Sequence, residues 1–322
     1  MLEVRLTIGE FINKASLSAP GAEKNTSHSA TMYFAEVLAK NFALPGDSVM
    51  SFSISVIIST FDCPKRLDLV LLGFEHQTVK DFQIIVADYG ATEETLQALT
   101  EFKQHTSKSV LHVSHSEEGF HKPSVLNQAI LQADGEYLIF TDGMSIPRKD
   151  FVEAHMKMAR TGRFLSGGRS RLPPCCAVEI SRDDVSSGSA FNLFWLLTKG
   201  YPDTADKSRL LSKGLWARFL NFINFRKNKW YCHNSSGWKT DILSVNGFDE
   251  RMQSMEGMDW EMGYRLKNSG IKVKSVRYTA ACIQLFYDAL YYKHGAKENN
   301  DAIREETTKT KKRYTRFGIL KS

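Results

Sequence analysis

The sequence predicts an α/β protein with a mostly parallel sheet flanked by helices, in a Rossmann-like arrangement. Two observations support this fold class. Short runs rich in Ile, Val and Leu alternate with amphipathic stretches of about 10–15 residues, as expected for repeated strand–helix–strand units. Acidic residues also follow several of the apolar runs, where an open parallel sheet binds its ligands. The right-handed crossover rule then favours a Rossmann-like half-domain.

The first half of the chain gives the clearest elements. We expect strands over residues 54–60, 82–88, 110–113 and 136–141. We expect helices between them over residues 64–77, 93–104 and 123–133, the second with Thr92 as its N-cap. After Pro147 the alternation weakens. There the pattern predicts helices over 149–160, 240–245 and 259–268, and short strands within 165–172 and 271–278.

The domain organisation follows from these patterns. Residues 1–50 form an N-terminal extension, with helical apolar spacing over 32–44. That helix either packs onto the main domain or binds a partner. The main domain covers residues 51–290, with its two halves at 51–147 and 148–290. Residues 291–322 are predicted to be a basic C-terminal tail.

Composition excludes several protein classes. No stretch approaches the roughly 18 apolar residues of a membrane span, and no secretory signal is visible at the N-terminus. The five cysteines have no metal-ligand spacing, which favours a reducing cytoplasm. The net charge of +6 suits an anionic ligand or membrane surface, or is ordinary surface lysine. No recognised nucleic-acid module accompanies it, so nucleic acid is not an expected partner.

Polar side chains stand at the carboxyl ends of the predicted strands. They are Thr60, Asp62, Asp88 and Asp142. The ends of parallel strands meet in one crevice, where carboxylates can accept bonds from a nucleotide or hold a hard cation against phosphate. Any one of these residues could instead cap a helix. Together they favour a nucleotide site.

Several motifs resemble family 2 glycosyltransferases of the GT-A fold. The resemblance covers residues 51–287, most of the chain, and its later motifs are similar to a galactosyltransferase-like C-terminal segment. The motifs are residues 57–62, 84–90, 121–130, 135–142, 246–250 and 259–266.

The resemblance implies a role for each matching position. Thr60 and Asp62 border the nucleobase pocket, and Asp88 accepts a hydrogen bond from the base. Lys122 and Asn127 lie near the nucleotide and donor sugar, and Asp142 contacts the ribose or a divalent cation. These residues make up the donor half of the implied site.

On the acceptor side, the resemblance implies that Asp259 is the general base that deprotonates the acceptor hydroxyl. Taken alone, Asp259 is better explained as the N-cap of the following helix, and it is the surrounding pattern that favours the base. Asn234 and Trp238 match a stretch that lines the acceptor.

The chain departs from the family pattern where a metal is expected. Met144 replaces the second acid of the Asp-x-Asp motif, and Gln284 and Tyr287 replace histidine positions. A thioether is a poor ligand for Mg²⁺ or Mn²⁺, which prefer oxygen. Asp142 and Gln284 remain as the expected metal ligands. The sequence therefore predicts a weak or absent metal requirement.

The expected function is transfer of a sugar, with inversion, from a nucleoside diphosphate sugar to a glycan or lipid-linked acceptor. In place of a metal, Lys122, Arg169 and Arg171 could neutralise the diphosphate. The alternative is a catalytically inactive protein that binds a nucleotide sugar or glycan. A nucleotidyltransferase would need a Gly-rich phosphate loop after the first strand, and residues 61–64 lack one.

The stretch 191–230 combines aromatic residues with lysine and arginine. This composition suits an interfacial helix on an anionic membrane, which would place the protein at the inner face of the membrane. The other interpretation is a core helix with a basic edge.

Overall fold

A computed structural model describes residues 52–115, 121–201, 207–224, 229–255, 257–285 and 296–321. The chain divides into two units, residues Met1–Met50 and Ser51–Ser322. The N-terminal extension and its expected helix over 32–44 lie outside the described residues.

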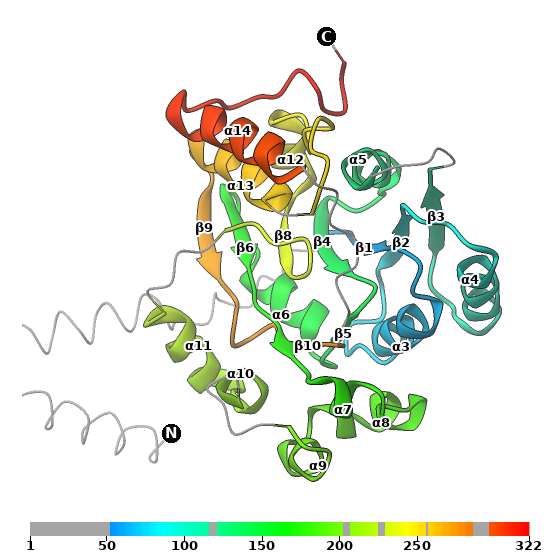
Figure 1. Cartoon of the computed structure of the whole chain (residues 1–322). Helices are drawn as coiled ribbons and strands as arrows, with labels where there is room; N and C mark the ends of the chain where they lie inside the picture. The colour runs from blue at the N-terminus through cyan, green and yellow to red at the C-terminus, as the bar shows by residue number, and fades with distance from the viewer. Residues whose placement is uncertain are drawn as a thin grey trace, which may run out of the picture. The chain divides into compact units, whose positions relative to one another are not determined.

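The centre of the second unit is a seven-stranded, mostly parallel sheet with the order β3-β2-β1-β4-β8-β6-β9 (Figure 1). Strands β1 to β4 are mutually parallel, β8 is antiparallel to both β4 and β6, and β9 is parallel to β6. The strands are β1 Ile54–Thr60, β2 Gln83–Asp88, β3 Val110–Ser114, β4 Tyr137–Asp142, β6 Arg163–Ser166, β8 Ser235–Trp238 and β9 Lys272–Ser275. The predicted α/β fold is confirmed, and the four strands expected in the first half are all present.

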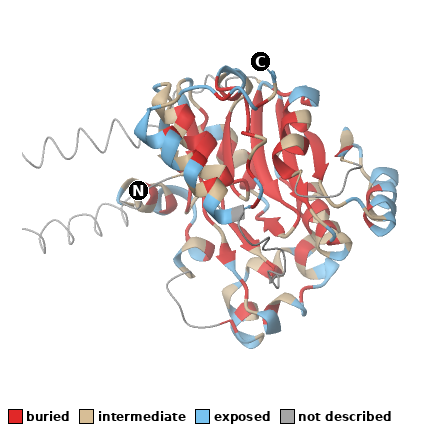
Figure 2. Cartoon of the chain, turned by 45° about the horizontal axis from the view of Figure 1, so that its top comes forward, coloured by how far each residue is buried: buried red, intermediate tan, exposed pale blue. Residues whose placement is uncertain are grey.

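Helices cover both faces of the sheet. One apolar cluster joins β1 and β2 to α3, α4 and α6, and the other joins the opposite side of these strands to α5, α12 and α13. Figure 2 shows the resulting buried interior, with exposed residues on the outer helices. The helices in the first half and in the final third are α3 Pro64–Glu75, α4 Glu93–His105, α5 Lys122–Gln132, α6 Phe151–Met158, α12 Lys239–Ser244, α13 Met258–Asn268 and α14 Ala296–Lys309.

Local sequence accounts for most of these boundaries. Helix α4 begins after Thr92, whose hydroxyl accepts a hydrogen bond from the Thr95 amide at 3.3 Å, as predicted. Helices α3 and α5 each have proline in their first turn, where the missing N–H costs no helical bond. Each strand from β1 to β4 ends within one residue of the predicted end, because an apolar run stops there.

The region between β6 and β8 is built from short helices. They are α7 Pro174–Ala177, α8 Arg182–Ser187, a 3₁₀ turn at Ser189–Phe191, α9 Leu193–Thr198, α10 Lys207–Leu211 and α11 Gly214–Phe222. A second, three-stranded sheet has the order β5-β10-β7, with β5 Ser145–Pro147, β7 Ser170–Arg171 and β10 Cys282–Gln284. This small sheet brings three segments that are distant in sequence to the end of β4.

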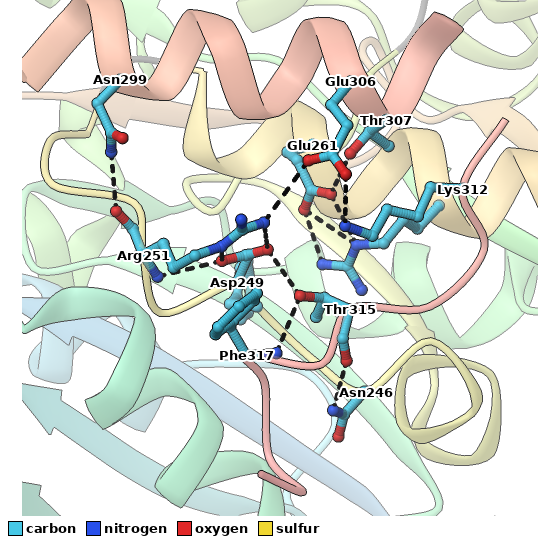
Figure 3. A network of polar contacts seen from close by, with 12 residues as sticks. Asn246, Asp249, Arg251, Glu261, Asn299, Glu306, Thr307, Lys312, Thr315 and Phe317 are labelled. Atoms are coloured by element: carbon cyan, nitrogen blue, oxygen red, sulfur yellow. Dashed lines mark hydrogen bonds and ion pairs between the residues drawn. The ribbon is translucent and has the colours of Figure 1, made fainter. Parts of the chain in front are cut away.

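The segment predicted to be a basic tail contains helix α14, which packs against α13 (Figure 3). The Thr307 hydroxyl donates to Glu261 at 2.8 Å, and the Thr315 hydroxyl donates to Asp249 at 2.6 Å. The Asn246 side chain donates to the Thr315 carbonyl at 2.7 Å. Residues 296–321 are therefore part of the folded second half, whereas residues 291–295 and 322 lie outside the described residues.

Candidate active site

The carboxyl ends of β1, β2 and β4 lie side by side. Thr60 is opposite Asp88 in the β1–β2 register, and Ser59 is opposite Asp142 in the β1–β4 register. The structure thus brings Thr60, Asp88 and Asp142 to one edge of the sheet, as parallel strands require.

Thr60 and Asp62 follow one another at the end of β1. The Thr60 hydroxyl lies 3.2 Å from the Cys63 sulfur and is buried. Gly143 packs closely on Thr60, since a Cβ at position 143 would lie 2.7 Å from that hydroxyl oxygen. Asp62 has a φ of +37° and an exposed side chain. The end of β1 therefore has one buried hydroxyl, on Thr60, and one exposed carboxylate, on Asp62.

Asp88 is fully buried and already has two partners. Its Oδ1 accepts from the Gly90 amide at 3.1 Å, and its Oδ2 lies 3.3 Å from His112 Nε2. The adjacent Tyr89 ring packs against Phe61, with 5.1 Å between ring centroids. The carboxylate is thus held rigidly beside an aromatic pair.

Asp142 stands at the end of β4, and its Oδ1 accepts from the Met144 amide at 3.2 Å. In the small sheet Gln284 is opposite Ser145 on one side and Arg171 on the other. The end of β4 and the adjoining small sheet thus contribute one carboxylate, from Asp142, one amide, from Gln284, and one guanidinium, from Arg171. Within the described ranges, no three His, Cys, Asp or Glu side chains are grouped to hold a metal ion. This donor set fits a tight Mg²⁺ or Mn²⁺ site poorly.

Lys122 connects the two halves of the candidate site. It begins helix α5 and is almost completely buried. Burial lowers its pKa, but the electrostatic contributions of Tyr89, Asp259, Cys232 and Asp142 outweigh burial and raise the pKa above its ordinary value. Lys122 is therefore protonated, and its charge is stabilised by acids from both halves of the domain, Asp142 in the first half and Asp259 in the second.

Asp259 lies in the first turn of α13. Its Oδ2 accepts a hydrogen bond from the Cys232 amide at 2.9 Å. Its Oδ1 is buried and has no hydrogen-bond partner. One carboxylate oxygen is fixed, and the other remains able to accept a proton.

His233 was not predicted from the sequence, although it directly precedes Asn234. Burial lowers its pKa well below the ordinary range, and Arg169, Lys122, Arg277 and Arg171 lower it further. The ring is therefore neutral. Arg169 can only donate, so its 2.9 Å contact with His233 Nδ1 leaves the ring proton on Nε2. The arrangement gathers cations close to Lys122.

Asn127 and Asn234 have buried structural partners. The Asn127 amide donates to the Phe248 carbonyl at 2.9 Å, and its oxygen accepts from the Phe248 amide at 2.8 Å. Asn234 donates to the carbonyls of Gly168 and Ala280 at 2.7 and 2.9 Å. Both side chains hold loops around the candidate site, so the contacts with donor and acceptor implied by the resemblance would compete with these bonds.

Trp238 does not reach this edge of the sheet. It pairs with Tyr137, the first residue of β4, whereas Asp142 is the last. Its ring packs against Phe52 and Tyr137 with centroid distances of 5.0 and 5.2 Å. Because β8 runs antiparallel to β4, its last residue lies at the opposite end of the sheet from Asp142.

Comparison with known proteins identifies the family of this domain. Residues 55–210 match the family model described as Glycosyl transferase family 2. The chain carries a family 2 glycosyltransferase domain. The uncharacterized glycosyltransferase YfnE of Bacillus subtilis is 34% identical over 247 residues, which cover 67% of this chain and 61% of that protein. The expected galactosyltransferase-like character of the C-terminal segment stays a prediction.

Two further similarities are more distant. Chondroitin synthase of Pasteurella multocida is 23% identical over 236 residues, covering 68% of this chain and 23% of that protein. The solved mannosyltransferase PcManGT of Pyrobaculum calidifontis, in complex with GDP-Man and Mn²⁺, has a TM-score of 0.49 at 15% identity, covering 82% of this chain and 67% of that one. This chain spans less than two thirds of the length of either curated relative.

Proposed function

We propose that this glycosyltransferase domain transfers a sugar from a nucleoside diphosphate sugar to a hydroxyl of a glycan or lipid-linked acceptor, with inversion at the anomeric carbon. The family match supports the reaction class. The observation that carries the proposal is the Asp259 carboxylate at the start of α13, whose Oδ2 is held by the Cys232 amide while its Oδ1 has no hydrogen-bond partner.

Asp259 is the base in this proposal. Its unpartnered Oδ1 takes the proton of the acceptor hydroxyl while the acceptor oxygen bonds to the anomeric carbon. The bond between that carbon and the diphosphate oxygen breaks, and the nucleoside diphosphate leaves with the electron pair. The Cys232 amide keeps the carboxylate in place during this step.

The leaving diphosphate gains negative charge, which the site has to stabilise. Lys122, Arg169 and Arg171 supply positive charge, and their joint electrostatic effect on His233 supports their proximity. Asp142 and Gln284 are the oxygen ligands left for Mg²⁺ or Mn²⁺. We therefore propose weak or no metal dependence, with these cations as the main stabilising groups.

Donor binding involves the edge formed by β1, β2 and β4. Thr60, Asp62 and Asp88 border the base and ribose in this proposal, and Asp142 contacts the ribose. The proposed setting is the cytoplasm, at the inner face of a membrane if the acceptor is lipid-linked. Among the described residues, no helix is both long and apolar enough to cross a bilayer.

The test is to mix the purified chain with a panel of nucleotide sugars and glycan or lipid-linked acceptors, with and without Mn²⁺, and to measure release of nucleoside diphosphate. Acceptor-dependent release with at least one donor is expected, with little change on adding EDTA. No release with any pair, together with measurable nucleotide binding, would overturn the proposal. That outcome would favour the binding-only alternative, which the replacement at Met144 makes the natural second candidate.

A further inference from the structure

Helix α11 presents an exposed apolar stripe. Leu215 and Trp216 in the helix, and Ile223 directly after its last residue, are 51%, 57% and 40% exposed. At 100° per residue these positions fall on one face of the helix, together with Phe219. The Trp216 ring stacks on the Phe219 ring, with 5.4 Å between centroids and 24° between planes. The stripe is thus a continuous surface and not a set of scattered side chains.

The opposite face of α11 is packed against the domain. Ala217 is fully buried, and Asn221 is 5% exposed. The Asn221 side chain donates to the Thr279 hydroxyl at 3.1 Å and accepts from the Tyr278 amide at 3.0 Å. These contacts fix the rotation of the helix, so the apolar stripe cannot turn inward to the core.

Positive charge lies on both sides of the stripe. Lys213 and Arg218 flank it in the helical projection, and residues 207–224 contain no Asp or Glu. Lys213 also lines a hollow of about 440 Å³ together with Lys149 and the ion pair formed by Arg148 and Asp150. An apolar stripe bordered by cations matches the layered structure of a bilayer surface, where acyl chains lie beneath anionic headgroups.

We propose that α11 lies in the plane of a membrane interface, with Leu215, Trp216 and Ile223 among the acyl chains and Lys213 and Arg218 on anionic phospholipid headgroups. The two cations beside the stripe favour an anionic membrane over a purely apolar protein surface. Such a protein surface would leave Lys213 and Arg218 without a counter-charge. The proposal does not depend on the reaction that the domain catalyses.

The test is co-sedimentation of the full chain with vesicles of phosphatidylcholine alone and of an equal mixture with phosphatidylglycerol. We expect binding to the mixed vesicles only, and loss of that binding in 1 M salt, where screening is strong. The double variant Lys213→Glu/Arg218→Glu and the single variant Trp216→Ser should each weaken binding by about tenfold or more.

Leu131→Ser is the matched control, because Leu131 is 56% exposed on α5. It should bind vesicles as the wild type does, and circular dichroism should show that all variants fold. Absence of wild-type binding, or equal losses in the control and the α11 variants, would overturn the proposal. So would a vesicle-free dimer that Trp216→Ser dissociates, because the stripe would then be covered by a second copy of the chain.

Discussion

The Cys232 amide holds Oδ2 of Asp259 at 2.9 Å, and the other oxygen of that carboxylate is buried without a partner. Hydrogen bonds to a carboxylate stabilise its ionised form, so the oxygen that lacks them is the better proton acceptor. One backbone contact thus both orients the side chain and leaves one of its oxygens available to accept a proton.

Replacing Asp259 with Asn should remove the proposed base and leave the rest of the site in place. We expect turnover to fall by about 10²–10⁴-fold, the usual contribution of a general base, while the affinity for nucleotide changes little. Initial rates of diphosphate release and calorimetric titration with nucleotide measure the two effects. Asp183→Asn, an exposed acid on α8, is the control. Turnover of Asp259→Asn close to that of the control would exclude Asp259 as the base.

Replacing Met144 with Asp should restore the second acid of the metal motif. Met144 adjoins Asp142, whose Oδ1 accepts from the Met144 amide. Two carboxylates at this spacing offer Mn²⁺ the hard oxygen ligands that it prefers. We expect Mn²⁺ affinity, measured by calorimetry in the presence of nucleotide, to rise by about tenfold or more. Met144→Leu, which adds no oxygen, should bind Mn²⁺ as the wild type does, and equal affinities for all three proteins would contradict the prediction.

Arg265 and Glu261 form a buried ion pair in α13, with side-chain exposures of 0% and 1%. Replacing Arg265 with Met leaves a buried carboxylate without its cation, which costs about 3–5 kcal/mol. Lys309 and Glu305 have the same spacing in α14 but are exposed. Lys309→Met should therefore change the free energy of unfolding by less than about 0.5 kcal/mol. Urea unfolding of both variants makes the comparison, and similar losses in the two would refute it.

His155 should make stability depend on pH. Burial lowers its pKa to about 3, although its bond with Asn234 raises it in part. The unfolded chain binds a proton on this ring near pH 6.5, whereas the folded chain does so only near 3. The stability that neutral His155 contributes is therefore fully present above pH 6.5. It is lost as the pH falls from about 6.5 to about 3, by up to about 1.4 kcal/mol per pH unit.

Urea unfolding of the wild type and His155→Gln at about pH 7 and about pH 5 measures this effect. The wild type should lose more stability than the variant between the two conditions, because other titrating groups are common to both proteins. Equal losses would show that His155 does not account for the dependence.

The sequence patterns located β1 to β4 and their helices because each strand is a continuous apolar run with an abrupt end. Strand β8 gave no such signal. It reads Ser-Ser-Gly-Trp, and its buried serines are satisfied by internal hydrogen bonds, such as that between Tyr137 and Ser236 at 2.8 Å. Helix α14 is mostly polar, and its buried side chains include Asn300 and Thr307, so its sequence resembles a solvated tail.

The candidate site was predictable where it depends on parallel strands, as for Thr60, Asp88 and Asp142. Trp238 could not be placed because the direction of β8 was not evident from its sequence. The partners of Asn127 and Asn234 lie about 50 to 120 residues away along the chain. No local pattern distinguishes a side chain that supports a loop in this way from one that binds a ligand.

The bond between Asp249 and Thr315 has a consequence for synthesis of the protein. The two residues are 66 positions apart, and Asp249 is 2% exposed in the folded chain. At about 5–20 residues per second, several seconds pass on the ribosome between translation of the two codons. Over that interval the carboxylate of Asp249 has its partners on Arg251 but lacks the Thr315 hydroxyl, so this contact between the two segments forms only after residue 315 has emerged.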